Sequence, residues 1–179
     1  YSWIEYYKIK FKSKFFFPLT NDNKLVLMGR AEFGFLGYYN IHKRSPFETF
    51  WVGGDGMSGY SSTYATETVA LRGYPNGSLT PYGSEGYAYI RLGAELRYPL
   101  MLENSTSIYA LGFVEGGNAW TEVSKFNPFN LKRSAGIGLR IFLPMVGMMG
   151  LDWAYGFDKV NGSSDYSGSQ FHFILGQEF

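Results

Sequence analysis

The stretch GLDWAYGFD, residues 150–158, alternates large apolar residues with small or charged ones at every step. Leu151, Trp153, Tyr155 and Phe157 take the odd positions, and glycine, alanine and aspartate take the even ones. Because successive side chains of a β-strand point to opposite faces, this pattern predicts a strand with one apolar and one polar face. Charges among small residues on the polar face are typical of a membrane β-barrel wall, with lipid outside and a polar lumen inside.

The composition fits one all-β domain of the same kind. The chain has 179 residues, with 23 glycines, no cysteine and 20% aromatic residues. Aromatic residues gather at both membrane interfaces of β-barrels, which need no long apolar run. The absence of cysteine excludes a disulfide scaffold and a thiolate metal site. A net charge of +1 gives no indication of a nucleic-acid partner.

The same alternation recurs along the chain and predicts an antiparallel wall of about seven strands. We expect these strands over residues 3–17, 24–38, 86–98, 107–117, 132–143, 148–157 and 169–179. The connections between them alternate between short turns and longer loops, as periplasmic turns and outside loops do in outer-membrane barrels. This assignment puts the C-terminus in the periplasm and makes residues 39–85 a long outside loop.

The long outside loop and the odd strand number both need an explanation. A connection of about 45 residues without structure of its own is unusual, so we expect this loop to be functional or folded upon another part of the protein. An odd number of strands does not close a single-chain bacterial barrel, and free sheet edges are costly in lipid. Either the count is off by one, or the remaining strands come from sequence outside residues 1–179, and we prefer the second interpretation.

Two motifs lie in the long loop. The first is an aromatic-x-Gly-Gly segment that ends in Gly53 and Gly54, and the second is Leu71-Arg72-Gly73-Tyr74. An Arg-Gly-aromatic triplet alone is a weak signal. Its place after Gly-Gly, in the longest loop and before a series of alternating strands, makes it specific.

These motifs, together with the aromatic-ended stretch 170–179, resemble the BamA superfamily (bacterial surface antigen type) of outer-membrane barrel insertases and secretion pores. That family has a Val-Arg-Gly-Phe-type motif in its long sixth outside loop. The resemblance implies that these are the last strands of a barrel of about sixteen. Residues 55–70, between the two motifs, depart from the family pattern, and we expect an insertion there.

The resemblance also implies that the loop folds into the lumen and that Arg72 meets acidic residues of the inner wall. Glu95 and Glu115 lie at inward positions of adjacent predicted strands, and a planar guanidinium donates hydrogen bonds to two carboxylates better than an ammonium does. Gly73 would let the backbone approach the wall closely, and Tyr74 would pack beneath it and hydrogen-bond through its hydroxyl. The alternative is a solvated Arg72 and glutamates that line a wet lumen.

The terminal strand carries a second hypothesis. Phe171, Phe173 and Phe179 would face lipid, whereas Gly176 would face inward and favour a kink. In the family, the last strand pairs weakly with the first, and this seam opens to template a client strand by β-augmentation. The alternative is a simple closing strand with an aromatic residue at its end.

The first strand presents a row of inward lysines: Lys8, Lys10, Lys12 and Lys14. They could form an anion-selective stripe, but balancing acidic residues on the inner wall is the preferred interpretation. Enzymatic motifs, phosphate loops and metal-ligand spacings are not found in the sequence, and we interpret His172 as a wall residue. No cofactor and no metal are expected.

The resemblance implies a non-enzymatic function: folding and inserting β-barrel clients into the bacterial outer membrane through a seam at the last strand. The implied partners are outer-membrane lipid, nascent barrel clients, the rest of the barrel, periplasmic POTRA domains and accessory assembly lipoproteins. The alternatives are a two-partner secretion pore of the same superfamily, an outer-membrane enzyme and a passive porin.

Overall fold

The computed structural model of the protein describes residues 4–56, 67–103, 106–145 and 147–175. Apart from strands, these ranges contain single 3-10 turns at Ile41–Lys43 (η1), Pro81–Gly83 (η2) and Val123–Lys125 (η3). None of these helical turns has the length or the apolar character needed to cross a membrane.

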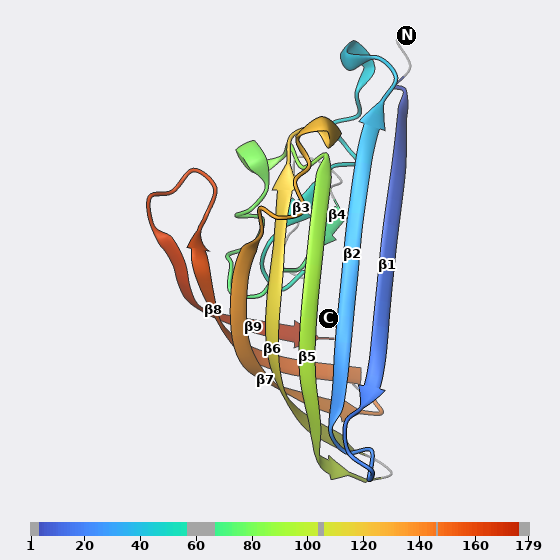
Figure 1. The fold of residues 1–179 in the computed structure, drawn as a ribbon, viewed down its shortest axis with the longest axis vertical. Helices are drawn as coiled ribbons and strands as arrows, with labels where there is room; N and C mark the ends of the chain where they lie inside the picture. The colour runs from blue at the N-terminus through green and yellow to red at the C-terminus, as the bar shows by residue number, and fades with distance from the viewer. Residues whose placement is uncertain (1–3, 57–66, 104–105, 146, 176–179) are drawn as a thin grey trace.

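A single seven-stranded sheet forms the body of the molecule, in the order β1-β2-β5-β6-β7-β8-β9. Its strands are β1 (Tyr6–Pro18), β2 (Val26–Tyr38), β5 (Ala88–Leu102), β6 (Ser107–Trp120), β7 (Lys132–Leu143), β8 (Gly147–Lys159) and β9 (Tyr166–Leu175). Every neighbouring pair is antiparallel. The predicted seven-stranded antiparallel wall is therefore confirmed, with strand ends shifted by a few residues. Figure 1 shows the sheet curled, so that β8 and β9 run across the direction of β1.

The two faces of the sheet differ as the alternation predicts. In β8, burial alternates at every residue from Gly150 to Phe157. Leu151 is 54% exposed, whereas Asp152 is fully buried. The outer face is thus apolar and exposed, and the face called the inner wall below carries the buried polar residues. Exposed apolar rows of this kind suit contact with lipid chains, as in the outward band of a membrane barrel.

The connection between β2 and β5 is folded rather than structureless. It contains a two-stranded parallel sheet of β3 (Phe50–Val52) and β4 (Glu67–Val69). We did not predict these strands, because three-residue strands are too short to show an alternating pattern. β4 lies within the 55–70 segment that we expected to be an insertion, and residues 57–66 of that segment lie outside the described ranges.

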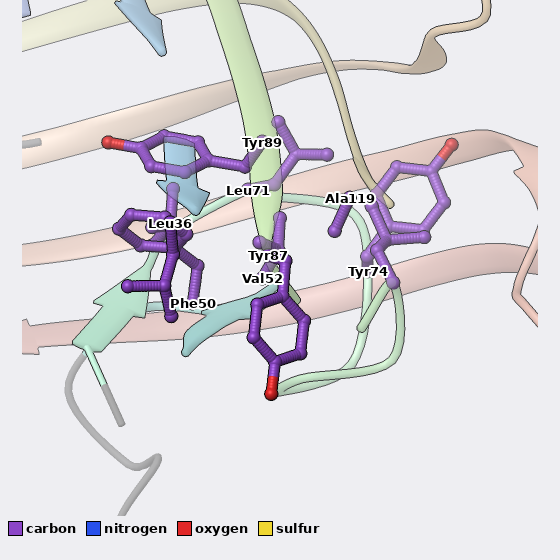
Figure 2. Packing of buried hydrophobic residues seen from close by; sticks show 10 residues of the cluster. Leu36, Phe50, Val52, Leu71, Tyr74, Tyr87, Tyr89 and Ala119 are labelled. Atoms are coloured by element: carbon purple, nitrogen blue, oxygen red, sulfur yellow. The ribbon is translucent and has the colours of Figure 1, made fainter. Parts of the chain in front are cut away.

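Apolar side chains hold this connection against the inner wall. Figure 2 shows Phe50, Val52, Leu71 and Tyr74 of the connection gathered with residues of the sheet. The cluster consists of Leu36, Phe50, Val52, Val69, Leu71, Tyr74, Leu79, Tyr87, Tyr89 and Ala119. Full burial of a large apolar side chain stabilises by about 1.5–3 kcal/mol, so the cluster is a substantial part of what keeps the connection in place.

Candidate functional site

The two loop motifs pack directly on each other. The N–H of Gly54 donates to the carbonyl of Leu71 at 3.0 Å, and the N–H of Leu71 donates back at 3.1 Å. Gly53 and Gly54 have φ values of +121° and +83°, which disfavour residues with a side chain. A Cβ on Gly53 would lie 2.6 Å from the carbonyl oxygen of Pro75. The Gly-Gly segment is therefore the base on which residues 71–74, here called the loop tip, are built.

The guanidinium of Arg72 is buried among three carboxylates of the inner wall. Its Nη2 lies 2.5 Å from Oε1 of Glu95 on β5 and 2.7 Å from Oε1 of Glu115 on β6. Its Nη1 lies 3.2 Å from Oδ2 of Asp152 on β8. The backbone N–H of Arg72 also donates to Oε2 of Glu115 at 3.0 Å. The structure thus brings both glutamates expected from the sequence to Arg72 and adds an aspartate.

Two further features keep Arg72 charged in this buried place. Its guanidinium carbon lies 3.5 Å from the ring centroid of Phe113, which is close enough for a cation–π contact. Burial disfavours the charged form, but the carboxylates of Glu115 and Glu95 outweigh this effect and raise the pKa of Arg72 above its usual value. The loop tip therefore holds a permanent positive charge against the wall.

Each of the three carboxylates also binds an arginine of the wall itself. Arg91 Nη2 lies 2.7 Å from Glu115, Arg97 Nη2 lies 2.8 Å from Glu95, and Arg140 Nη1 lies 2.6 Å from Asp152. Arg72 therefore completes a network that joins β5, β6, β7 and β8. Removal of one member from such a buried network leaves charges unpaired, which costs more than the net stabilisation of the pair.

Gly73 brings the backbone of the loop tip against β7, β8 and β9. Its φ is +85°, and a Cβ at this position would lie 2.7 Å from Cβ of Ser134. Its N–H donates to Nε2 of His172 at 2.9 Å, and its carbonyl accepts from the hydroxyl of Ser167 at 2.5 Å. A side chain at position 73 is thus opposed both by backbone conformation and by space.

Tyr74 fixes the other end of the loop tip. Its side chain is fully buried, and its hydroxyl donates to the backbone carbonyl of Arg133 at 2.7 Å. Burial raises the pKa of the Tyr74 phenol to about 12, so the hydroxyl stays protonated and able to donate. The packing and the hydroxyl bond expected for Tyr74 are both present.

The terminal strand points its aromatic residues outward. Phe171 and Phe173 on β9 are 72% and 57% exposed. Gly176 and Phe179, the other expected residues of the seam, lie outside the described residues.

The lysines of β1 meet carboxylates mainly from the long connection. Lys8 lies 3.0 Å from Glu48 and 3.1 Å from Glu67, and Lys10 lies 3.0 Å from Glu67. Of the wall acids, Glu32 lies 3.7 Å from Lys12. Lys8 and Lys10 therefore bind the connection to β1. This role differs from the predicted balancing of acidic residues on the inner wall.

Within the described ranges, no group of three or more histidine, cysteine, aspartate or glutamate residues is arranged to hold a metal ion.

Comparison with known families gives the context of this site. The profile of the Omp85 superfamily domain matches residues 1–179, which is the whole chain. The chain belongs to the Omp85 superfamily. The family resemblance seen in the loop motifs and the terminal strand is therefore confirmed.

This Omp85 domain is similar to known BamA proteins. It is 29% identical over 128 residues to the outer membrane protein assembly factor BamA of Neisseria meningitidis serogroup B, across 65% of this chain and 14% of that protein. The crystal structure of BamA from Haemophilus ducreyi lacking POTRA domains 1–3 matches with a TM-score of 0.68 and 19% identity, across 95% of this chain and 35% of that one. The chain thus spans a minor part of the relatives that it matches.

Several residues of the Omp85 domain's site went unrecognised in the sequence. Asp152 lies at an even position of the 150–158 stretch, where a carboxylate on a strand face of small residues was a usable signal. Arg140 lies on the inner face of β7, and its bond to Asp152 depends on the register of β7 and β8. His172 was assigned to the wall correctly, yet its bond to the loop tip joins residues far apart in the chain and has no local signal.

Proposed function

We propose that this Omp85 domain is the C-terminal barrel part of an outer-membrane protein assembly factor, which folds and inserts β-barrel clients without an enzymatic step. The proposal places the domain in the bacterial outer membrane, in contact with lipid through its exposed apolar face. The similarity to BamA proteins and the curled antiparallel sheet support it. The free energy of insertion would come from strand pairing and burial of the client itself.

The observation that carries the proposal is the attachment of the loop tip to the inner wall by Arg72. The β2–β5 connection packs on the inner wall through the apolar cluster, which includes Leu71 and Tyr74 of the loop tip, and through the arginine network around Arg72. A passive porin needs an open aqueous lumen. A connection fastened in this way suits a barrel whose lumen is occupied and whose wall must be held in one defined shape.

The last strand is the proposed site of client pairing. In the described part of the chain, β9 lies at the edge of the sheet and pairs with β8. Exposed strand edges recruit further strands through their unpaired N–H and C=O groups. We assign the client-binding seam to this edge, which includes Phe171 and Phe173 and extends towards Gly176 and Phe179.

The orientation of the domain and its partners follow from the same proposal. The connections β1–β2, β5–β6 and β7–β8 are short, and Figure 1 shows the β1–β2 and β5–β6 turns at the end opposite to the β2–β5 connection. Short turns are periplasmic in bacterial barrels, so the C-terminus would be periplasmic. POTRA domains, accessory assembly lipoproteins and the remaining strands are the partners expected there.

Reconstitution of the full-length protein in proteoliposomes tests the proposal. The readout is the heat-resistant folded fraction of a small eight-stranded reporter barrel added as unfolded chain. We expect the wild type to accelerate folding, Arg72→Ala to lose most of this acceleration, and Lys125→Ala, a substitution in the exposed η3 turn, to retain it.

Two results would reject the proposal in favour of its rivals. Export of a soluble passenger without acceleration of barrel folding would identify a two-partner secretion pore. A large steady conductance of the intact protein, together with no effect on the reporter, would identify a passive porin.

A further inference from the structure

A polar cavity lies between the long connection and the N-terminal half of the sheet. Its volume is about 300 Å³, enough for several waters at roughly 30 Å³ each or for a hydrated anion. Its charged lining comprises Lys12, Lys14, Arg30, Arg91, Glu32 and Asp55. Four cations thus face two carboxylates, and the cavity has a surplus of positive charge.

A single carboxylate is shared among three of these cations. Glu32 lies 3.6 Å from Arg30 and 3.8 Å from Arg91, both through the same oxygen. Its second oxygen lies 3.7 Å from Lys12. All three distances exceed that of a good hydrogen bond. Glu32 therefore offsets the charges of Arg30 and Lys12 only partly, whereas Arg91 is also bound by Glu115 at 2.7 Å.

Glu115 and Glu95, further along the wall, also act on Arg30 through their charge, but each of them already binds two other arginines. Glu115 accepts hydrogen bonds from Arg72 and Arg91. Glu95 accepts hydrogen bonds from Arg72 and Arg97. These two carboxylates are therefore shared with the network that holds the loop tip, and they offset the charge of Arg30 only in part.

Arg30 is the residue most affected by this lack of negative charge and of hydrogen-bond acceptors. Its side chain is 2% exposed, and neither Nε nor Nη2 has a hydrogen-bond partner among the described residues. Gly93 lies opposite Arg30 on β5 and adds no side chain that could accept a bond. A buried guanidinium with unused donors is costly, and an anion is the natural partner for its planar fork.

We propose that this cavity is a binding site for a phosphate group, with Arg30 as its principal ligand. Arg30 would donate through Nε and Nη2 to two phosphate oxygens, the paired geometry that guanidinium and phosphate favour. Lys14, which faces Arg30 across the β1–β2 pair, adds a second positive charge at the cavity. The phosphate could be free in solution or carried by a lipid headgroup, since both present the same oxygens.

Calorimetric titration of the full-length protein with inorganic phosphate tests this site. The protein is held in nanodiscs of zwitterionic phosphatidylcholine, in phosphate-free buffer of constant ionic strength. We expect saturable binding that Arg30→Gln weakens about tenfold or more and that Lys14→Gln weakens less. Lys125→Gln is the matched control, because Lys125 is exposed in the η3 turn and binds Glu122. We expect it to leave binding unchanged.

A second arm separates the two sources of phosphate. If a headgroup occupies the site, nanodiscs that contain anionic phosphatidylglycerol will compete with added phosphate, and if the natural ligand is free phosphate they will not. Either result supports a phosphate site.

Three outcomes would overturn the proposal: no saturable binding, equal binding of chloride, or equal phosphate affinity in the wild type and in both cavity variants. Heat-modifiable gel mobility identifies any variant that fails to fold, and Lys14→Gln then provides the test alone. Failure here would leave client folding intact, so the two proposals are tested separately.

Discussion

Nε2 of His172 accepts a hydrogen bond from the backbone N–H of Gly73 at 2.9 Å, so the last described strand contacts the loop tip directly. Both groups are buried. A second bond, from Ser167 to the carbonyl of Gly73, joins the same two segments. Any movement of β9 away from the wall must therefore break the contacts that position the loop tip.

Replacement of His172 should loosen the loop tip. His172→Leu removes the acceptor and leaves the N–H of Gly73 buried without a partner, at a cost of about 1–3 kcal/mol. We expect a lower midpoint of thermal unfolding for the full-length protein and faster protease cleavage within residues 67–87. The unfolding midpoint of His172→Gln, which keeps an acceptor, should lie between those of the wild type and His172→Leu. Equal midpoints for the wild type and the leucine variant would show that this bond contributes nothing.

Gly73→Ala should destabilise the loop tip more than the same change at a comparable glycine. Position 73 combines a φ of +85° with a Cβ contact of 2.7 Å, whereas Gly83 has a φ of +74° with no atom within 4 Å. Gly83→Ala therefore measures the conformational cost alone, about 1–2 kcal/mol. Denaturant unfolding gives the free energy of unfolding of both variants, and we expect Gly83→Ala to be the more stable of the two. A smaller loss at position 73 than at position 83 would argue against close contact with the wall.

The attachment of β4 to β1 should depend on pH through Glu67. Burial tends to raise the pKa of this carboxyl, but hydrogen bonds from Lys10 and Lys8 outweigh it and hold the pKa below its ordinary value of 4.5. The stabilisation is therefore fully present above that ordinary value and is lost as pH falls through the lower folded value. The side chain is partly exposed, so we expect at most about 1 kcal/mol.

The measurement for Glu67 is the free energy of unfolding as a function of pH. Between about pH 5 and pH 3, the wild type should lose more unfolding free energy than Glu67→Gln does, because the variant has no carboxyl to protonate at this position. Glu103→Gln, a carboxylate in the β5–β6 turn, is the control and should leave the profile unchanged. Superimposable curves for the wild type and Glu67→Gln would rule out this contribution.

The strands of the wall could be predicted from the sequence because each of them alternates apolar with small or polar residues. The alternation in residues 150–158 depends only on the two-residue period of a strand, and the structure follows it from Gly150 to Phe157. The contact of Arg72 with wall acids was implied by the family resemblance of its motif, and the inward positions of Glu95 and Glu115 then made them the candidates. Antiparallel pairing of adjacent strands then placed the two glutamates within reach of one side chain.

The other contacts join residues that are far apart in the chain, so no local sequence pattern predicts them. The parallel pairing of β3 with β4 joins segments that are short and separated in the chain. The position of His172 beside Gly73 requires the curl of the whole sheet to bring β9 under the loop tip. Lys8 and Lys10 form ion pairs with Glu48 and Glu67 of the loop. The alternation of residues along a strand does not predict where the side chains of a loop lie.

The burial of Arg72 on the inner wall is the central claim, and amide hydrogen exchange of the full-length protein tests it most directly. Peptides that cover residues 71–80 should exchange slowly in the wild type, because the N–H of Arg72 and the N–H of Gly73 are bonded to wall residues. Arg72→Ala should speed this exchange strongly, since loss of one member of a buried network costs about 3–5 kcal/mol. Arg72→Lys should restore little of the protection, because an ammonium lacks the planar fork. Exchange in the wild type as fast as that of a solvated loop, or equally slow in Arg72→Ala, would contradict the account.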